Sequence, residues 1–225
     1  MKKKIKSIIK KNNFCQNLFI DFDGVIVDSN LIKEKLISQS INYIDNENEI
    51  NDYAIDYFNK NAGIDRIKKL EKFYEKEMVE KIAANYSKNF REIIPKLKPT
   101  KCFIEFIEYF KNQRPNIKIY ILSGGDKNEI KEFLEINKLS FYFDDILSSE
   151  KSKFEHLEFL KAKSDDIFIG DSNKDLEAAK AFNLNFILME GYKSLESFPK
   201  ELLLEKDEIL RVLNFCSLLA LCKEN

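Results

Sequence analysis

Short runs of apolar residues alternate with longer amphipathic segments along much of the chain. Four runs have the length and continuous hydrophobicity of strands that are covered on both faces, as in a parallel sheet. They are Leu18–Asp21, Ile117–Leu122, Ile167–Ile169 and Phe186–Met189. Between the later runs, apolar side chains recur at helical spacing over residues 130–137, 154–161 and 176–182. This alternation predicts βαβ units, and therefore an α/β fold with a doubly wound parallel sheet.

The segment between the first two predicted strands has a different pattern. It contains few strand signals, and apolar stripes predict helices over residues 31–44, 64–74 and 78–90. Pro95 and Pro99 mark the return of the chain to the sheet. Thr100 is a candidate cap for the helix that follows. We therefore predict a helical insertion at residues 30–95, within a core formed by residues 17–29 and 96–225.

The two ends of the chain carry weaker signals. The first residues, MKKKIKSIIKKNN, are basic, and lysines interrupt the isoleucines, so no signal-peptide core follows. We predict a solvated extension over residues 1–16, with a basic helix on a membrane surface as the alternative. No run is long enough to span a bilayer, so we expect no membrane partner. Ile209–Leu213 reads either as an edge strand or as part of a terminal helix.

Composition narrows the class of protein. The 225 residues, 44% of them hydrophobic, allow one large domain or a core with a small insertion. The net charge of −1 predicts no nucleic-acid partner. The four cysteines are scattered, so we expect reduced thiols in a cytoplasmic protein. His156 is the only histidine, so a zinc site or a histidine-based triad is not expected. We predict that His156 is exposed.

Polar and acidic residues follow three of the predicted strands. Ligands of an open parallel sheet bind beyond the carboxyl ends of its strands, so residues from distant segments should meet there. In chain order they are Asp21, Asp23, Ser123, Gly124, Gly125, Gly170, Asp171 and Asp175.

Several carboxylates in one place are unfavourable unless a cation compensates their charge. Mg²⁺ suits such a site, because it prefers oxygen ligands and bridges to substrate phosphate. A carboxylate is also a competent nucleophile toward a phosphoryl group. The serine hydroxyl and glycine amides suit a phosphate cradle. Lys151 or Lys153, just before the third strand, would balance the anionic charge.

Four segments, DFDGVIVDS, ILSGG, EKSKFEHL and FIGDSNKD, resemble in this order the motifs of the haloacid dehalogenase (HAD) superfamily. The resemblance covers residues 18–189 approximately, and the helical insertion lies where the family inserts its C1 cap. It implies a Rossmann-like core and a Mg²⁺-dependent enzyme of the phosphoglycolate phosphatase or β-phosphoglucomutase-like branch. Many relatives carry asparagine where Gly124 follows the serine of the second motif.

The resemblance also implies a role for each matching residue. Asp21 matches the nucleophile, which also binds the metal. Asp23 matches the general acid/base, whose backbone carbonyl contacts the metal. Ser123 and the Gly124 amide match the groups that bind the phosphoryl oxygens. The other matches are Asp171 as metal ligand, Asp175 as second acid, and Lys153, favoured over Lys151, as the active-site lysine.

The aspartate at position 23 favours a phosphate ester, because family members that cleave other bonds lack it. We therefore predict a phosphatase acting on a small soluble phosphomonoester such as a sugar, polyol or amino-alcohol phosphate. A phosphomutase is the alternative, although Lys33 stands where those enzymes carry histidine; it could contact an anionic substrate or face solvent. A non-catalytic scaffold is a further alternative. Asp28 and Ser29 read as caps of the first inserted helix, and the oligomeric state stays open.

Overall fold

The computed structural model describes residues 16–45, 49–61, 63–192 and 209–223. All of the predicted basic extension except Gln16 therefore lies outside the described residues. Within the described ranges, no helix is both long enough and apolar enough to cross a membrane.

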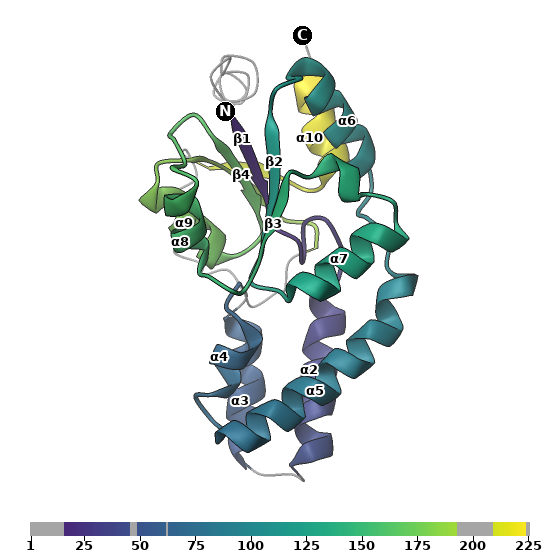
Figure 1. Ribbon diagram of the computed structural model, residues 1–225, viewed down its shortest axis with the longest axis vertical. Helices are drawn as coiled ribbons and strands as arrows, with labels where there is room; N and C mark the ends of the chain where they lie inside the picture. Colours follow the sequence, from purple (N-terminus) through teal and green to yellow (C-terminus); the bar gives the residue numbers. More distant parts are fainter. Residues whose placement is uncertain (1–15, 46–48, 62, 193–208, 224–225) are drawn as a thin grey trace.

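A parallel six-stranded sheet with the order β3-β2-β1-β4-β5-β6 forms the centre of the molecule (Figure 1). This confirms the predicted doubly wound sheet. The short β3 escaped prediction because three residues carry little pattern, and the ambiguous C-terminal segment contains the edge strand β6 followed by a helix. The strands are β1 (Asn17–Ile20), β2 (Lys118–Leu122), β3 (Asp145–Leu147), β4 (Ile167–Gly170), β5 (Asn185–Met189) and β6 (Leu210–Val212).

Helices cover both faces of the sheet, as the continuous hydrophobicity of its strands requires. In β1, Leu18 and Ile20 pack into one apolar cluster, and Phe19 packs into the other. The first cluster includes side chains of α6 (Phe103–Gln113), α7 (Lys127–Ile136) and α10 (Phe215–Lys223). The second includes side chains of α8 (Lys153–Phe159) and α9 (Asn173–Ala181).

The helical insertion lies below the sheet in Figure 1, next to the end of β1. Its apolar side chains continue the larger core cluster, so the insertion and the sheet share one hydrophobic core. The predicted stripe over residues 64–74 forms only the five-residue helix α4, and α3 was not predicted. The helices are α2 (Asn30–Ile44), α3 (Glu49–Lys60), α4 (Arg66–Leu70) and α5 (Lys76–Ile93), before the 3-10 turn Ile94–Lys96.

Two antiparallel connections join the insertion to the sheet. Val27 on the outgoing connection pairs with Pro99 on the returning one. The Thr100 amide donates to the Ile26 carbonyl at 2.8 Å, and its hydroxyl donates to the Val25 carbonyl at 2.7 Å. Thr100 therefore ties the two connections together, and its predicted role as a helix cap is wrong: α6 begins at Phe103.

Two further expectations from the sequence are wrong. Cys102 and Cys216, which are 114 residues apart in the chain, form a disulfide between the start of α6 and α10. His156 is 4% exposed, and its Nε2 lies 2.8 Å from the Ser148 carbonyl oxygen. Cys222 is a buried free thiol, and burial raises its pKa to about 11. Sequence spacing could show neither the pairing nor the burial, because both arise from packing between distant segments.

Candidate active site

The turn after β1 places two aspartates at the carboxyl edge of the sheet. The Asp21 amide donates to the Ile169 carbonyl at 2.9 Å, which ties it to the neighbouring strand β4. Gly24 has a φ of +73°, and a Cβ there would lie 2.0 Å from Asp171 Oδ2. Glycine therefore serves two needs here: a left-handed backbone and the close approach of a carboxylate.

Three buried carboxylates converge where β1 and β4 end. Asp21, Asp171 and Asp175 each offer a ligand oxygen, and these oxygens lie within 4.8 Å of one another. Burial, then the charge of Asp175, raise the pKa of Asp21 to about 7. Burial, then Asp21 and Asp175, raise the pKa of Asp171 well above its ordinary value. The metal-free cluster therefore binds protons more readily than isolated carboxylates do, and a cation would compete with those protons.

Lys153 lies against this cluster. Its Nζ is 3.1 Å from Asp21 Oδ1 and also forms an ion pair with Asp175 Oδ1. Burial lowers the lysine pKa, but Asp175 and Asp21 outweigh burial and raise it above the ordinary value. Lys151 is exposed, with its Nζ over the Phe159 ring. Of the two candidate lysines, the structure places Lys153 beside Asp21.

Asp175 is held by many hydrogen bonds. Its Oδ2 accepts from the Ser172 amide at 3.0 Å, the Ser172 hydroxyl at 2.7 Å and the Asp171 amide at 3.2 Å. These bonds include a capping box at the start of α9. Lys153 contacts Oδ1, so both oxygens of Asp175 already have partners. We infer that Asp175 orients Lys153 and the loop that carries Asp171.

The remaining carboxylates fit a hard divalent cation. Asp21 and Asp171 would hold it, because each carries an oxygen with capacity for a ligand bond. Burial and the neighbouring carboxylates raise the pKa of both groups, and a bound cation would favour their charged forms. The Asp23 carboxylate is not part of the cluster.

Asp23 instead faces the first helix of the insertion. The Ser29 hydroxyl donates to its Oδ1 at 2.6 Å, and Lys33 Nζ donates to its Oδ2 at 2.6 Å. Ser29 precedes α2 but makes no side-chain cap bond, so the predicted capping role is wrong for this residue. The solvent-facing alternative for Lys33 is also wrong, since its side chain is 16% exposed.

The loop after β2 supplies a serine and two glycines. Ser123 is buried, and its hydroxyl accepts a hydrogen bond from the Gly125 amide at 3.1 Å. A Cβ at Gly124 would lie only 2.7 Å from the Gly63 carbonyl oxygen of the insertion. The glycine that departs from the usual asparagine therefore lets the insertion approach this loop closely.

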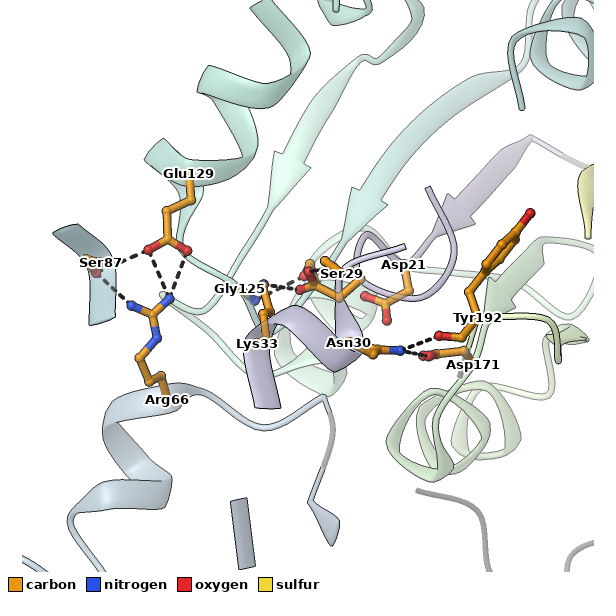
Figure 2. A network of polar contacts seen from close by, with 12 residues as sticks. Asp21, Ser29, Asn30, Lys33, Arg66, Ser87, Gly125, Glu129, Asp171 and Tyr192 are labelled. Carbon is orange, nitrogen blue, oxygen red and sulfur yellow. Dashed lines mark hydrogen bonds and ion pairs between the residues drawn. The ribbon is translucent and has the colours of Figure 1, made fainter. Parts of the chain in front are cut away.

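Asn30 was not predicted as a site residue. Its Nδ2 donates to Asp171 Oδ2 at 2.8 Å and to the Tyr192 carbonyl at 2.9 Å, as Figure 2 shows. The first residue of α2 thus holds the carboxylate of Asp171 in place. The sequence gives no signal for this contact, because 141 residues separate the two partners.

One cleft lies between the sheet and the insertion, and Lys153 and Asp175 are not among the residues that line it. It has a volume of about 700 Å³, including the part open to solvent. The sheet side contributes Asp21, Asp23, Ser123, Gly124, Gly125 and Asp171. The insertion contributes ten residues, among them the cations Lys33, Arg66 and Lys69. Arg66 and Lys69 also escaped prediction, because the apolar stripe over residues 64–74 predicts a helix but does not tell which of its polar side chains face the cleft.

An ion pair links the insertion to the sheet domain at the rim of the cleft. Arg66 on α4 donates to both oxygens of Glu129 on α7, at 3.0 and 2.8 Å, and to the Ser87 hydroxyl at 2.7 Å (Figure 2). The side chains of Arg66 and Glu129 are 14% and 3% exposed. The Arg66 guanidinium also lies over the Tyr86 ring at 3.8 Å. This contact holds α4 and α5 against α7.

We predict that the Arg66→Met substitution lowers the free energy of unfolding by about 3 kcal/mol, because it leaves the buried Glu129 carboxylate without its cation. Urea denaturation measures the change, and adding Glu129→Leu should restore most of the loss. The control is Lys60→Met, which removes an exposed pair with Asp56 and should cost less than about 0.5 kcal/mol. Equal losses for Arg66→Met and Lys60→Met would contradict a buried inter-element ion pair.

Comparison with known proteins agrees with this fold. The sequence profile of the haloacid dehalogenase-like hydrolase family matches residues 18–189, so the chain belongs to that family. No curated protein matches the chain.

Solved structures share the fold over nearly the whole chain. A hydrolase from Pseudomonas syringae has a TM-score of 0.71 at 16% identity, covering 91% of this chain and 96% of its own. A predicted phosphatase from Clostridium acetobutylicum has a TM-score of 0.66 at 22% identity, with 88% and 94% covered. A predicted phosphoglycolate phosphatase from Haemophilus somnus 129pt has a TM-score of 0.69 at 14% identity, with 93% and 98% covered.

Proposed function

We propose that the protein is a Mg²⁺-dependent phosphatase of small phosphomonoesters that acts through an aspartyl-phosphate on Asp21. The observation that carries this proposal is the buried cluster of Asp21, Asp171 and Lys153 at the carboxyl end of the central strand. A nucleophilic carboxylate beside the ammonium group of Lys153 suits phosphoryl transfer, because positioning and charge neutralisation supply most of the rate enhancement in such reactions.

In the first step, one Asp21 oxygen attacks the phosphorus atom, and the bond from phosphorus to the ester oxygen breaks. Lys153 Nζ neutralises charge on the transferred group, and the Ser123 hydroxyl and Gly124 amide bind its oxygens. A Mg²⁺ ion held by Asp21 and Asp171 would supply further positive charge. Asp23 delivers a proton to the departing alkoxide, which leaves as the alcohol.

In the second step, Asp23 takes a proton from water, and the hydroxide attacks the phosphorus atom of the aspartyl-phosphate. The bond between phosphorus and Asp21 then breaks, which frees phosphate and regenerates the carboxylate. Asp23 accepts hydrogen bonds from Ser29 and Lys33 in this structure. Substrate binding would turn one Asp23 oxygen from these partners toward the leaving group.

We propose that the helical insertion acts as the cap of this site. Gly63 on the insertion lies against Gly124 and Ser172 of the sheet domain, so this loop narrows the entrance. A cleft narrowed in this way suits a small metabolite better than a bulky substrate. Such a cover also excludes water from the reacting phosphate.

The alternative functions and the predicted location can be compared with the structure in turn. No observation on the described residues favours the phosphomutase or scaffold alternative, and Lys33 is paired with Asp23. The cytoplasmic location stays a prediction, and the Cys102–Cys216 disulfide speaks against it, because disulfides persist in oxidising compartments.

The test of this function is phosphate release from a panel of sugar, polyol and amino-alcohol phosphates, with Mg²⁺ and with excess chelator. We expect turnover of at least one ester, lost on chelation and restored by Mg²⁺. The panel should include a hexose 1-phosphate with its bisphosphate activator, because isomerisation without phosphate release would indicate a mutase. Full activity in chelator, or no turnover of any ester, would contradict the proposal.

A further inference from the structure

The start of α2, the first helix of the insertion, lies against the carboxylates of the site. Asn30 is the first residue of α2, and its Nδ2 donates to Asp171 Oδ2 at 2.8 Å and to the Tyr192 carbonyl at 2.9 Å (Figure 2). These two bonds use both protons of the amide group. The Asn30 side chain therefore joins the insertion to two loops of the sheet domain, one after β4 and one after β5.

The Asp171 carboxylate depends on this amide for its orientation. It is buried, and among the described residues no group other than Asn30 donates a hydrogen bond to it. Gly24 makes room for the contact, because a Cβ there would lie 2.0 Å from Asp171 Oδ2 and 2.3 Å from Asn30 Nδ2. Oδ2 is therefore confined between the turn after β1 and the amide, which fixes how the carboxylate presents its remaining lone pairs to a cation.

The same end of α2 also holds the other acid of the cleft. The Ser29 hydroxyl and Lys33 Nζ each donate to Asp23 at 2.6 Å. Asp23 follows β1 and Asp171 follows β4, yet both accept hydrogen bonds from this end of the insertion. A displacement of the start of α2 from the sheet would therefore release both acids together.

We propose that Asn30 is a positioning residue for the metal: it holds Asp171 in the orientation that binds Mg²⁺, and it thereby couples Mg²⁺ binding to the position of the insertion. This inference rests on the metal site of the proposed phosphatase but not on its choice of substrate. Hydrogen-bond partners that orient a metal ligand raise the affinity for the metal. Because coupling is reciprocal, a Mg²⁺ ion that fixes Asp171 also strengthens the hold of the sheet domain on α2.

The first test measures Mg²⁺ binding to the full chain by isothermal titration calorimetry, with no substrate present. Asn30→Ala should weaken the affinity for Mg²⁺ roughly 10- to 100-fold, the range for losing a group that orients a metal ligand. The Mg²⁺ concentration for half-maximal phosphate release should rise by the same factor. At saturating Mg²⁺, kcat should stay within about threefold of the wild-type value, because excess metal compensates for weaker binding.

The second test measures the coupling by hydrogen exchange of the α2 amides, with and without Mg²⁺. In the wild type, Mg²⁺ should slow this exchange, and in Asn30→Ala the slowing should be absent. A merely structural role would change the exchange equally in both conditions. Asn89→Ala is the matched control: Asn89 lies on α5 of the insertion, donates to Asn85 Oδ1 at 3.0 Å and does not line the cleft. It should keep the wild-type affinity and slowing.

The outcomes separate this inference from the proposed function. Wild-type Mg²⁺ affinity in Asn30→Ala would overturn the positioning role, and a persistent Mg²⁺-dependent slowing would overturn the coupling. If the alanine variant fails to fold, Asn30→Ser replaces it, because serine suits a helix start but is too short to make both bonds. A wild type that binds Mg²⁺ but releases phosphate from no ester overturns the phosphatase function alone. A wild type that binds no Mg²⁺ overturns both.

Discussion

Replacing Asp21 by asparagine should lower kcat for phosphate release on the order of 10⁴-fold or more, as expected for a covalent nucleophile. An amide oxygen of similar shape remains, but it cannot form the phosphoenzyme. The measurement is steady-state phosphate release with saturating Mg²⁺. Asp28→Asn is the control: it lies in the same N-terminal segment, is exposed, and should retain wild-type activity.

Stability measurements separate this loss from misfolding. Burial raises the Asp21 pKa from 3.8 to about 7, so ionisation costs the metal-free wild type stability as the pH rises from about 4 through 7. Asparagine cannot ionise. The metal-free Asp21→Asn variant should therefore melt higher than the wild type at pH 8, by a few degrees, and close to it at pH 4. Wild-type turnover by this variant would contradict the role of Asp21 as nucleophile. A lower melting temperature at pH 8 would contradict the raised pKa of Asp21.

Replacing Asp23 by asparagine should have an effect that depends on the leaving group. For alkyl phosphates, the first step loses its proton donor, and we expect kcat to fall roughly 10²- to 10⁴-fold. For p-nitrophenyl phosphate, whose leaving group needs no proton, the first step should stay fast while hydrolysis of the phosphoenzyme slows. Rapid mixing should then show a burst of p-nitrophenol close to one equivalent per site, followed by slow turnover.

The same variant can also contradict the role of Asp23 as general acid and base. If Asp23 only maintained local structure through Ser29 and Lys33, both ester types would lose activity equally and no burst would appear. Asp28→Asn again serves as the control and should turn over both esters at wild-type rates.

The sequence predicted the central part of the fold and the candidate residues because both have local signals. The buried strands are continuous apolar runs, and the residues after them stand at the carboxyl edge of a parallel sheet. Asp21 and Asp171 follow β1 and β4, which pair in register, so their convergence follows from topology. The sequence favoured Lys153 but left Lys151 open, because the two lie two residues apart; the packing of α8 places Lys153 beside Asp21.

The missed features depend on contacts between distant segments. The Arg66–Glu129 pair joins residues 63 positions apart, and the Cys102–Cys216 disulfide joins residues 114 positions apart. Lys69 is one of two neighbouring lysines on α4, and nothing in the sequence distinguishes the buried one from the exposed Lys68. Such features depend on how the insertion packs against the sheet, which local periodicity does not encode.

The most direct test of the account is to find the phosphoryl group on Asp21. Asp23→Asn, loaded with Mg²⁺ and p-nitrophenyl phosphate, is quenched in acid and reduced with borohydride, which converts an aspartyl-phosphate to homoserine. Peptide mass spectrometry then locates the homoserine. The account predicts homoserine at position 21, and only when the ester was present. Homoserine at another aspartate, or none at position 21 despite a full burst of p-nitrophenol, would contradict it.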